Sequence, residues 1–264
     1  MSEATQEETE VVRVERRDGV MIMTLNRPEA RNSLNLALTR ALSDAFDELD
    51  ADPELSAGVV TGAGKGFCSG MDLKAFVAGE NVWEGEADDR GLRRIVTRAA
   101  RKPLLAAVEG FAVAGGFELA LACDVLVAGR SAKFGVPEVK RSLVAAGGAL
   151  RQLPRRAGPG AAMKLALTGD LIDGERAYAI GLVDELTEDG GALDGAVALA
   201  LAIAANGPLA VAATKQVLRE GPELSDADFW ARQKEICDPV FASADAIEGS
   251  KAFAEKRAPV WTGS

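Results

Sequence analysis

The first part of the chain alternates between apolar runs and stretches with helical periodicity, which predicts strands followed by helices. Residues 11–17 and 20–26 are rich in Val, Ile and Met and flank Asp18-Gly19, a dipeptide typical of a two-residue hairpin turn. Residues 35–49 place apolar side chains three and four positions apart, so they predict a helix that ends before Asp52-Pro53.

Three short apolar runs predict buried strands, at residues 57–61, 104–108 and 125–128. The first is followed by a glycine-rich loop at 62–70. The second is followed by a turn of small residues at 112–116, which leads into a helix at 117–122. Strand, glycine-rich turn and helix in alternation is typical of an α/β architecture.

The remaining segments are mostly helical in pattern. Asp72 is expected to cap a short helix through Ala78, residues 79–90 predict a mobile loop, and 91–101 predict a basic amphipathic helix. Further helices are expected at 161–167, 174–180, 192–205, 209–219, 226–236 and 244–256. We expect a disordered acidic tail at 1–10, one α/β core at 11–200 and a helical region at 201–264.

Composition narrows the chemistry. The chain has 264 residues, 48% of them hydrophobic, which is enough to bury a substantial core. It contains no histidine, which excludes a Ser-His-Asp triad, a Cys-His pair and any His-ligated metal. Proton transfer must then fall to Glu, Asp, Lys, Tyr or Cys. The three cysteines, Cys68, Cys123 and Cys237, show no CxxC spacing, so we expect no metal site and reduced thiols in a cytoplasmic protein.

Charge and hydropathy argue against two classes of partner. The net charge of −10 is the opposite of what a general nucleic-acid binder shows. Residues 1–10 hold no apolar run and do not form a signal peptide, and the longest uncharged apolar stretch, 195–205, is too short to span a bilayer. We expect neither a nucleic acid nor a membrane as partner.

Two glycine-rich turns are candidates for anion binding. The turn from Gly62 to Gly66 fails as a P-loop, because Val59 stands where the first glycine belongs, and it fits a tight turn instead. The turn Ala114-Gly115-Gly116 opens a helix whose first N–H groups lack partners and attract negative charge. The turns around Met71 and Gly115 can together aim two N–H groups at one oxygen, as in an oxyanion hole. The alternative is that the glycines only serve helix packing.

Glu118 is a lone carboxylate in the apolar segment 112–122. The segment leaves no polar face for it, so we expect it to be buried, with a raised pKa suited to proton transfer. A structural Glu paired with an Arg is the alternative. Asp124 is interpreted as a capping or structural carboxylate, and Glu138, taken alone beside Lys140 and Arg141, as a surface charge.

Segments in consistent order along the chain resemble the enoyl-CoA hydratase/isomerase (crotonase) family. The likeness covers nearly the whole chain after residue 11 and centres on Gly115-Gly116-Phe117-Glu118-Leu119-Ala120 within 103–124. The other matching segments are 25–34, 61–74, 134–138, 167–170, 177–183 and 252–257. Each alone is weak, and their order makes the resemblance specific.

The resemblance implies a spiral core of ββα superhelix repeats and a C-terminal helical trimerisation region, giving a homotrimer or a dimer of trimers. It also implies an acyl-CoA thioester as substrate. The backbone N–H groups of Met71 and Gly115 match the oxyanion hole, and Glu118 and Glu138 match the two glutamates of the hydratases. With both present, the expected reaction adds water to a trans-2-enoyl-CoA. Glu118 is assigned as the base toward water and Glu138 as the acid toward C2, a division left open because the pair is coupled.

The same resemblance implies where coenzyme A binds. No separate cofactor is expected, because the coenzyme is part of the substrate. The matching positions within one chain are Ala30, Arg31, Ser69, Met71, Asp72, Leu73 and Lys74. Phe253 and Lys256 match positions that reach the coenzyme from a neighbouring subunit.

Four departures from the family pattern bear on these expectations. Glu29 stands where Lys is frequent, Glu109 where Asn is usual, and Ala114 where Gly is frequent; an alanine there is tolerable if φ stays negative. Residues 142–149 lack a Pro-Gly segment of short-chain hydratases, which leaves the acyl group open. The alternative functions are a 3,2-enoyl-CoA isomerase that uses one glutamate and a non-catalytic acyl-CoA-binding protein.

Overall fold

The predicted hairpin forms the edge of a six-stranded sheet. The computed structural model describes residues 10–83, 91–97 and 100–264. Strands β1 (Val12–Arg17) and β2 (Val20–Leu25) pair antiparallel. Asp18 and Gly19 between them both have positive φ, 48° and 81°, which a two-residue turn of this hand requires. This prediction is confirmed.

The remaining strands of the sheet are parallel, and all of them except the last, an edge strand, are largely buried. They are β3 (Ala57–Gly62), β4 (Leu104–Val108), β6 (Val125–Gly129) and β9 (Glu185–Thr187), in the order β1-β2-β3-β4-β6-β9. Helices cover both faces, which explains why β3, β4 and β6 appear as continuous apolar runs in the sequence. The three predicted core strands are confirmed.

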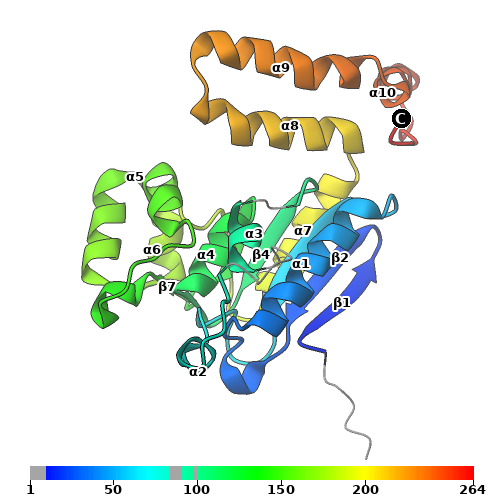
Figure 1. The fold of residues 1–264 in the computed structure, drawn as a ribbon. Helices are drawn as coiled ribbons and strands as arrows, with labels where there is room; N and C mark the ends of the chain where they lie inside the picture. The colour runs from blue at the N-terminus through cyan, green and yellow to red at the C-terminus, as the bar shows by residue number, and fades with distance from the viewer. Residues whose placement is uncertain (1–9, 84–90, 98–99) are drawn as a thin grey trace, which may run out of the picture.

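Different helices cover the two faces of this sheet (Figure 1). Helix α1 (Leu36–Ala51) lies on one face with α3 (Leu92–Thr97) and α4 (Gly115–Ala122). Helix α7 (Ala192–Ala204) lies on the other, where its alanines pack against alternate strand residues. Among the described residues, α3 ends at Thr97 and residues 100–101 are not helical, so the predicted helix at 91–101 is too long.

A second, three-stranded sheet was not expected. It consists of β5 (Phe111–Val113), β7 (Lys133–Gly135) and β8 (Ile172–Asp173). The chain passes from β4 to β5, through α4, to β6 and then β7, so it alternates between the sheets. The predicted turn at 112–116 is therefore wrong in part, because Phe111–Val113 pairs with β7 and the helix begins at Gly115.

Two helices near the second sheet have local features that the sequence explains, a capping residue in one and an internal glycine kink in the other. Helix α2 (Leu73–Val77) is capped by the Asp72 carboxylate, as predicted. Helix α5 (Ala149–Thr168) is kinked at Gly158, where φ is 78°, and only its second half was predicted. A 3-10 turn at Pro137–Arg141 precedes α5 in the chain, and α6 (Gly174–Ala179) follows α5.

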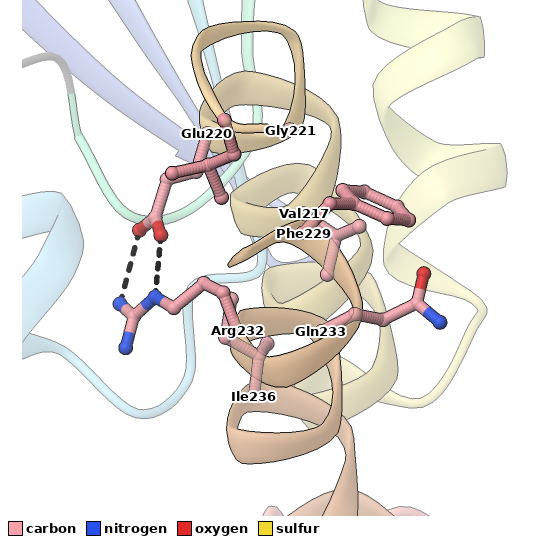
Figure 2. Close-up of a pocket in the computed structure, with 8 residues that line it drawn as sticks. Val217, Glu220, Gly221, Phe229, Arg232, Gln233 and Ile236 are labelled. Atoms are coloured by element: carbon pink, nitrogen blue, oxygen red, sulfur yellow. Dashed lines mark hydrogen bonds and ion pairs between the residues drawn. The ribbon is translucent and has the colours of Figure 1, made fainter. Parts of the chain in front are cut away.

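The C-terminal helices project away from the sheet, as Figure 1 shows. They are α8 (Pro208–Glu220), α9 (Asp226–Phe241) and α10 (Ala244–Glu255), close to the predicted ranges. Figure 2 shows α8 and α9 joined by an ion pair between Glu220 and Arg232, whose Oε2 and Nε lie 2.6 Å apart. These helices expose large apolar side chains, namely Leu218, Trp230, Phe241, Ile247 and Phe253.

One lysine fastens α8 to the core. The Lys215 ammonium donates to the carbonyl oxygens of Ala100 and Lys102, each at 2.7 Å, and pairs with Asp124 at 2.7 Å. Only 10% of its side chain is exposed. Arg219, one turn later, also pairs with Asp124 at 2.7 Å. Asp124 therefore has the structural role that was expected of it.

Glu109 supplies a cap that α7 lacks locally. The cap residue Gly191 has no side chain, and Glu109 Oε1, at the end of β4, accepts from Gly190 N at 3.0 Å and Ala192 N at 2.9 Å. The carboxylate thus satisfies free N–H groups at the positive end of the helix.

The first part of the expected mobile loop at 79–90 is packed. Glu80 Oε2 accepts from Leu36 N at 3.0 Å, and Val82 is buried and accepts from Leu92 N at 2.8 Å. These contacts tie Glu80 to the beginning of α1 and Val82 to α3, while residues 79–81 remain exposed. Residues 84–90, and the predicted acidic tail apart from its last residue, lie outside the described residues.

Two further findings concern thiols and hydropathy. Cys68 and Cys123 are buried and Cys237 is partly exposed, all as free thiols. Burial raises the pKa of Cys68 and of Cys123 to about 12. In the described ranges no single helix is long and apolar enough to cross a membrane, although 192–204 with 208–223, bent by 112°, passes by length and composition.

Candidate active site

The Met71 N–H is left free by the pairing of its neighbours. Leu34 forms a parallel β-bridge with Met71, in which Leu34 N donates to Gly70 O and Asp72 N donates to Leu34 O, both at 2.8 Å. Successive N–H groups of an extended chain point to opposite sides, so Met71 N–H faces away from Leu34. No acceptor for it lies in the part of the chain that the structure describes.

The Gly115 N–H lies beside it. Gly115 is the first residue of α4, where a backbone N–H has no partner within the helix. A Cβ atom built on Gly70 would lie 2.9 Å from Gly115 N, and one built on Gly115 would lie 3.4 Å from Met71 N. The two turns therefore bring two unpaired donors together, an arrangement that can hold one oxygen anion.

Ala114, the residue immediately before α4, has a strained backbone. Its φ is +51° and its ψ is −133°, a region that is essentially restricted to glycine. The condition under which an alanine is tolerable here, a negative φ, is therefore not met. The surrounding structure imposes this conformation, because Ala114 N donates to Gly135 O at 2.9 Å and Glu118 N to Ala114 O at 3.0 Å.

Glu118 lies one turn into α4 and is 5% exposed. Its carboxylate faces the beginning of α5, where Oε1 accepts from Ala149 N at 3.2 Å. A Cβ atom on Gly147 would lie 2.3 Å from Oε2, so a larger residue at this position would displace the Glu118 carboxylate.

Burial sets the proton affinity of Glu118. Burial raises its pKa to about 7, the nearby Glu138 carboxylate raises it too, and the N–H groups of Ala149 and Gly147 oppose the rise. The predicted burial and raised pKa are confirmed. The alternative of an Arg partner is wrong, since within the described ranges Glu118 has no cation partner.

Glu138 lies on the 3-10 turn at Pro137–Arg141, which contacts α5, the helix whose beginning Glu118 faces. Its Oε2 is buried and has no hydrogen-bond partner within the described chain. Burial raises its pKa, against the effect of Arg141. Its charge raises the pKa of Glu118, and its Oε2 is itself buried, so the interpretation of Glu138 as a plain surface charge is wrong.

The residues expected to hold coenzyme A form two groups. Ser69 N donates to Arg31 O at 3.1 Å, so the turn with Ala30 and Arg31 lies against the segment with Met71. Arg31, Leu73 and Lys74 are exposed there. The Asp72 side chain is occupied by structural contacts with Lys74 N, Ala75 N, Arg27 and Ser33.

Phe253 and Lys256 do not join this group within one chain. They lie at the end of α10, which Figure 1 places at the opposite end of the molecule from α2. Phe253 is 88% exposed. Sequence reasoning missed Arg27 and Gly147, although the pair Gly147-Gly148 before a helix was a usable signal. No group of three or more potential metal-ligating side chains occurs in the described ranges.

Comparison with known proteins gives consistent findings. The sequence model of the enoyl-CoA hydratase/isomerase family matches residues 15–264. The solved structure of enoyl-CoA hydratase EchA1 from Mycobacterium marinum is 56% identical, with a TM-score of 0.93 over 97% of this chain and 100% of that one. Enoyl-CoA hydratase EchA19 of Mycobacterium tuberculosis is 43% identical over 93% of this chain and 94% of its own. The 2,3-dehydroadipyl-CoA hydratase of Escherichia coli is 36% identical over 95% and 98%.

Proposed function

The chain belongs to the enoyl-CoA hydratase/isomerase (crotonase) family, and we propose that it adds water across the double bond of a trans-2-enoyl-CoA to give a 3-hydroxyacyl-CoA. The fold is the crotonase fold, mixed α/β with a helical C-terminal region. The observation that supports the proposal is the pair of buried carboxyl groups, Glu118 on α4 and Glu138 on the 3-10 turn, whose two elements both contact α5 and whose charges interact.

The paired N–H groups account for activation of the substrate. The thioester carbonyl is conjugated with the double bond, so attack of water at C3 moves negative charge onto the carbonyl oxygen. Met71 N and Gly115 N stabilise this enolate oxygen. The loss of one such donor typically lowers the rate by about 10²–10³.

The two glutamates account for the proton transfers. Water forms a bond to C3 and gives one proton to Glu118, whose pKa of about 7 leaves a large ionised fraction at neutral pH. Glu138, whose pKa is raised by burial, gives its proton to C2. The sum is one water added, and each transfer contributes roughly 10²–10⁴ in rate. The two groups are coupled, so the pair as a whole carries the proton.

We also propose how the coenzyme is held. Arg31 and Lys74 bind its phosphates, and Ala30, Ser69, Met71, Asp72 and Leu73 line its path. Phe253 and Lys256 reach it from a neighbouring subunit of a homotrimer or dimer of trimers, for which the exposed apolar residues of α8 to α10 supply a contact surface. The reaction needs no cofactor beyond the coenzyme of the substrate. We place the enzyme in the cytoplasm, which its three free thiols support.

Turnover of a panel of trans-2-enoyl-CoA esters, short to long, followed by mass spectrometry, tests the proposal. Gain of one water by any member is expected, and the best member defines the acyl group. A 3-enoyl-CoA in the same panel that returns a shifted double bond without water gain would instead identify an isomerase. Binding without any conversion would identify a non-catalytic acyl-CoA-binding protein.

A further inference from the structure

We propose that Arg27 is a positioning residue for the oxyanion-binding N–H of Met71. The inference rests on the proposed function, since it concerns how that site holds the thioester oxygen. Arg27 follows β2, and its guanidinium bonds to both segments of the bridge from which the Met71 N–H projects. It touches neither the expected position of the carbonyl oxygen nor the two glutamates.

The guanidinium spans two segments that are far apart in the sequence. Nη1 donates to Ser33 O at 2.6 Å, and Nη2 donates to Asp72 Oδ2 at 3.1 Å. Both ends are well buried, with 17% of the Arg27 side chain and 14% of the Asp72 side chain exposed. A charge-assisted pair at this depth is stronger than one in water.

These two acceptors flank the bridge that aims Met71. Ser33 precedes Leu34 on one segment, and Asp72 follows Met71 on the other. Arg27 therefore fixes the spacing of the two segments immediately beside the pair of backbone bonds that turns the Met71 N–H outward. A shift of the Asp72 segment moves that N–H relative to Gly115.

The Asp72 carboxylate, which Arg27 holds in place, also fixes the beginning of α2. Its Oδ1 accepts from Lys74 N at 3.0 Å and Ala75 N at 3.3 Å, so the same carboxylate caps α2. Burial raises its pKa, but the bonds from Ala75, Arg27, Ser33 and Lys74 outweigh this and lower it, so Asp72 is ionised. Without Arg27, a largely buried carboxylate loses its charged partner and must move toward solvent.

The turn itself does not depend on the guanidinium. Arg27 N donates to Asn32 Oδ1 at 2.9 Å, and Asn32 Nδ2 donates to Ala63 O and Gly66 O, both at 2.9 Å. None of these bonds involves the Arg27 side chain. Variants at position 27 are therefore expected to fold.

The test compares Arg27→Met with Arg27→Lys, whose single ammonium cannot reproduce the two-ended contact. Arg16→Met is the matched control. Arg16 lies on the exposed edge strand β1 and pairs with Glu48 and Asp52, away from the site. Steady-state kinetics use the best substrate of the panel. Stopped-flow absorbance of cinnamoyl-CoA before turnover reports on the carbonyl directly, since polarisation of a conjugated thioester shifts its absorption to longer wavelength.

For Arg27→Met we expect kcat to fall about 10- to 100-fold, less than the loss of a whole donor, and KM to rise by a smaller factor, because Asp72 also caps the helix that carries Lys74. The red shift of bound cinnamoyl-CoA should shrink, Arg27→Lys should be intermediate, and Arg16→Met should match the wild type. An unchanged red shift in folded Arg27→Met overturns the inference. If Arg27→Met does not fold, the same readings on Arg27→Lys decide, and an unchanged red shift there has the same meaning. Failure of the wild type to hydrate any ester, with the red shift intact, counts against the proposed function alone.

Discussion

The Glu118 carboxyl group is buried between apolar α4 and the first turn of α5, where ionisation is unfavourable. Burial raises its pKa from 4.5 to about 7. A shift of this size corresponds to about 3 kcal/mol of interaction that favours the protonated form. Glu118 is suited to accept a proton from water near neutral pH, and at the same pH its ionisation lowers the stability of the fold.

Replacing Glu118 with Gln is expected to abolish hydration and to change the pH dependence of stability. Between pH 4.5 and about 7 the unfolded chain releases this proton while the native chain retains it, so wild-type stability falls as pH rises. The variant lacks that fall. Its free energy of unfolding, minus that of the wild type, should rise by up to about 3 kcal/mol over this interval and then level off.

Urea denaturation of both proteins at several pH values measures this difference, since their other carboxyl groups are shared. A difference that stays flat from pH 4.5 to 8 would contradict a raised Glu118 pKa. Loss of the fold in Glu118→Gln would instead support a structural role.

Ala114→Gly is expected to stabilise the protein and keep its activity. The positive φ of Ala114 stores roughly 1–3 kcal/mol of strain that glycine removes, against about 0.5–1 kcal/mol of added backbone entropy in the unfolded chain. The melting temperature should therefore rise. Ala78→Gly, at an exposed position with φ of −73°, is the control and should lower it. A lower melting temperature for Ala114→Gly would contradict the strain.

Glu109 joins the end of β4 to the beginning of α7. Glu109→Ala removes the acceptor of two backbone N–H groups and is expected to lower the free energy of unfolding by about 1–2 kcal/mol. Glu109→Gln keeps an acceptor oxygen and should lose less. Chemical denaturation measures both, and an equal loss in the two variants would show that the charge, rather than the cap, matters.

Elements with a local signal were predictable from the sequence. The hairpin, α1 and α2 each carry a turn dipeptide or a capping side chain beside an apolar pattern. Strands β5, β7 and β8 were not, because two or three residues show no periodicity and their pairing is with distant segments. The first half of α5 was missed as well, since Gly158 interrupts its pattern.

The candidate active site also combines features that a local sequence pattern predicts with features that depend on tertiary contacts. The burial of Glu118 follows from a helix with no polar face, so the sequence predicts it. The approach of Glu138 depends on how the chain turns between β7 and α5, which no local pattern specifies. The positive φ of Ala114 and the ion pair between Arg27 and Asp72 depend on tertiary contacts, so only the structure reveals them.

The position of the C-terminal helices relative to the core depends on Lys215. Lys215→Met leaves Asp124 without its most buried cation and two carbonyl groups without a donor. We expect a loss of about 2–4 kcal/mol in the free energy of unfolding, because two carbonyl groups lose their donor and Asp124 keeps only the more exposed Arg219 as its cation.

Lys234→Met is the control, since Lys234 pairs with Asp238 on an exposed helix surface and should contribute less than about 0.5 kcal/mol. Thermal and urea unfolding of the two variants provide the comparison. Equal stability of Lys215→Met and wild type would show that α8 is held by packing alone.

The different burial of the three cysteines makes the native chain a protein with a single accessible thiol. Cys68 and Cys123 are buried with pKa values near 12, so few thiolates are available to a maleimide while the fold is intact. Cys237 is partly exposed on α9. A fluorophore or spin label added to the unmodified single chain would therefore attach at α9 alone, and slow attachment in the native protein would report that the proposed assembly covers this helix, without any engineered cysteine.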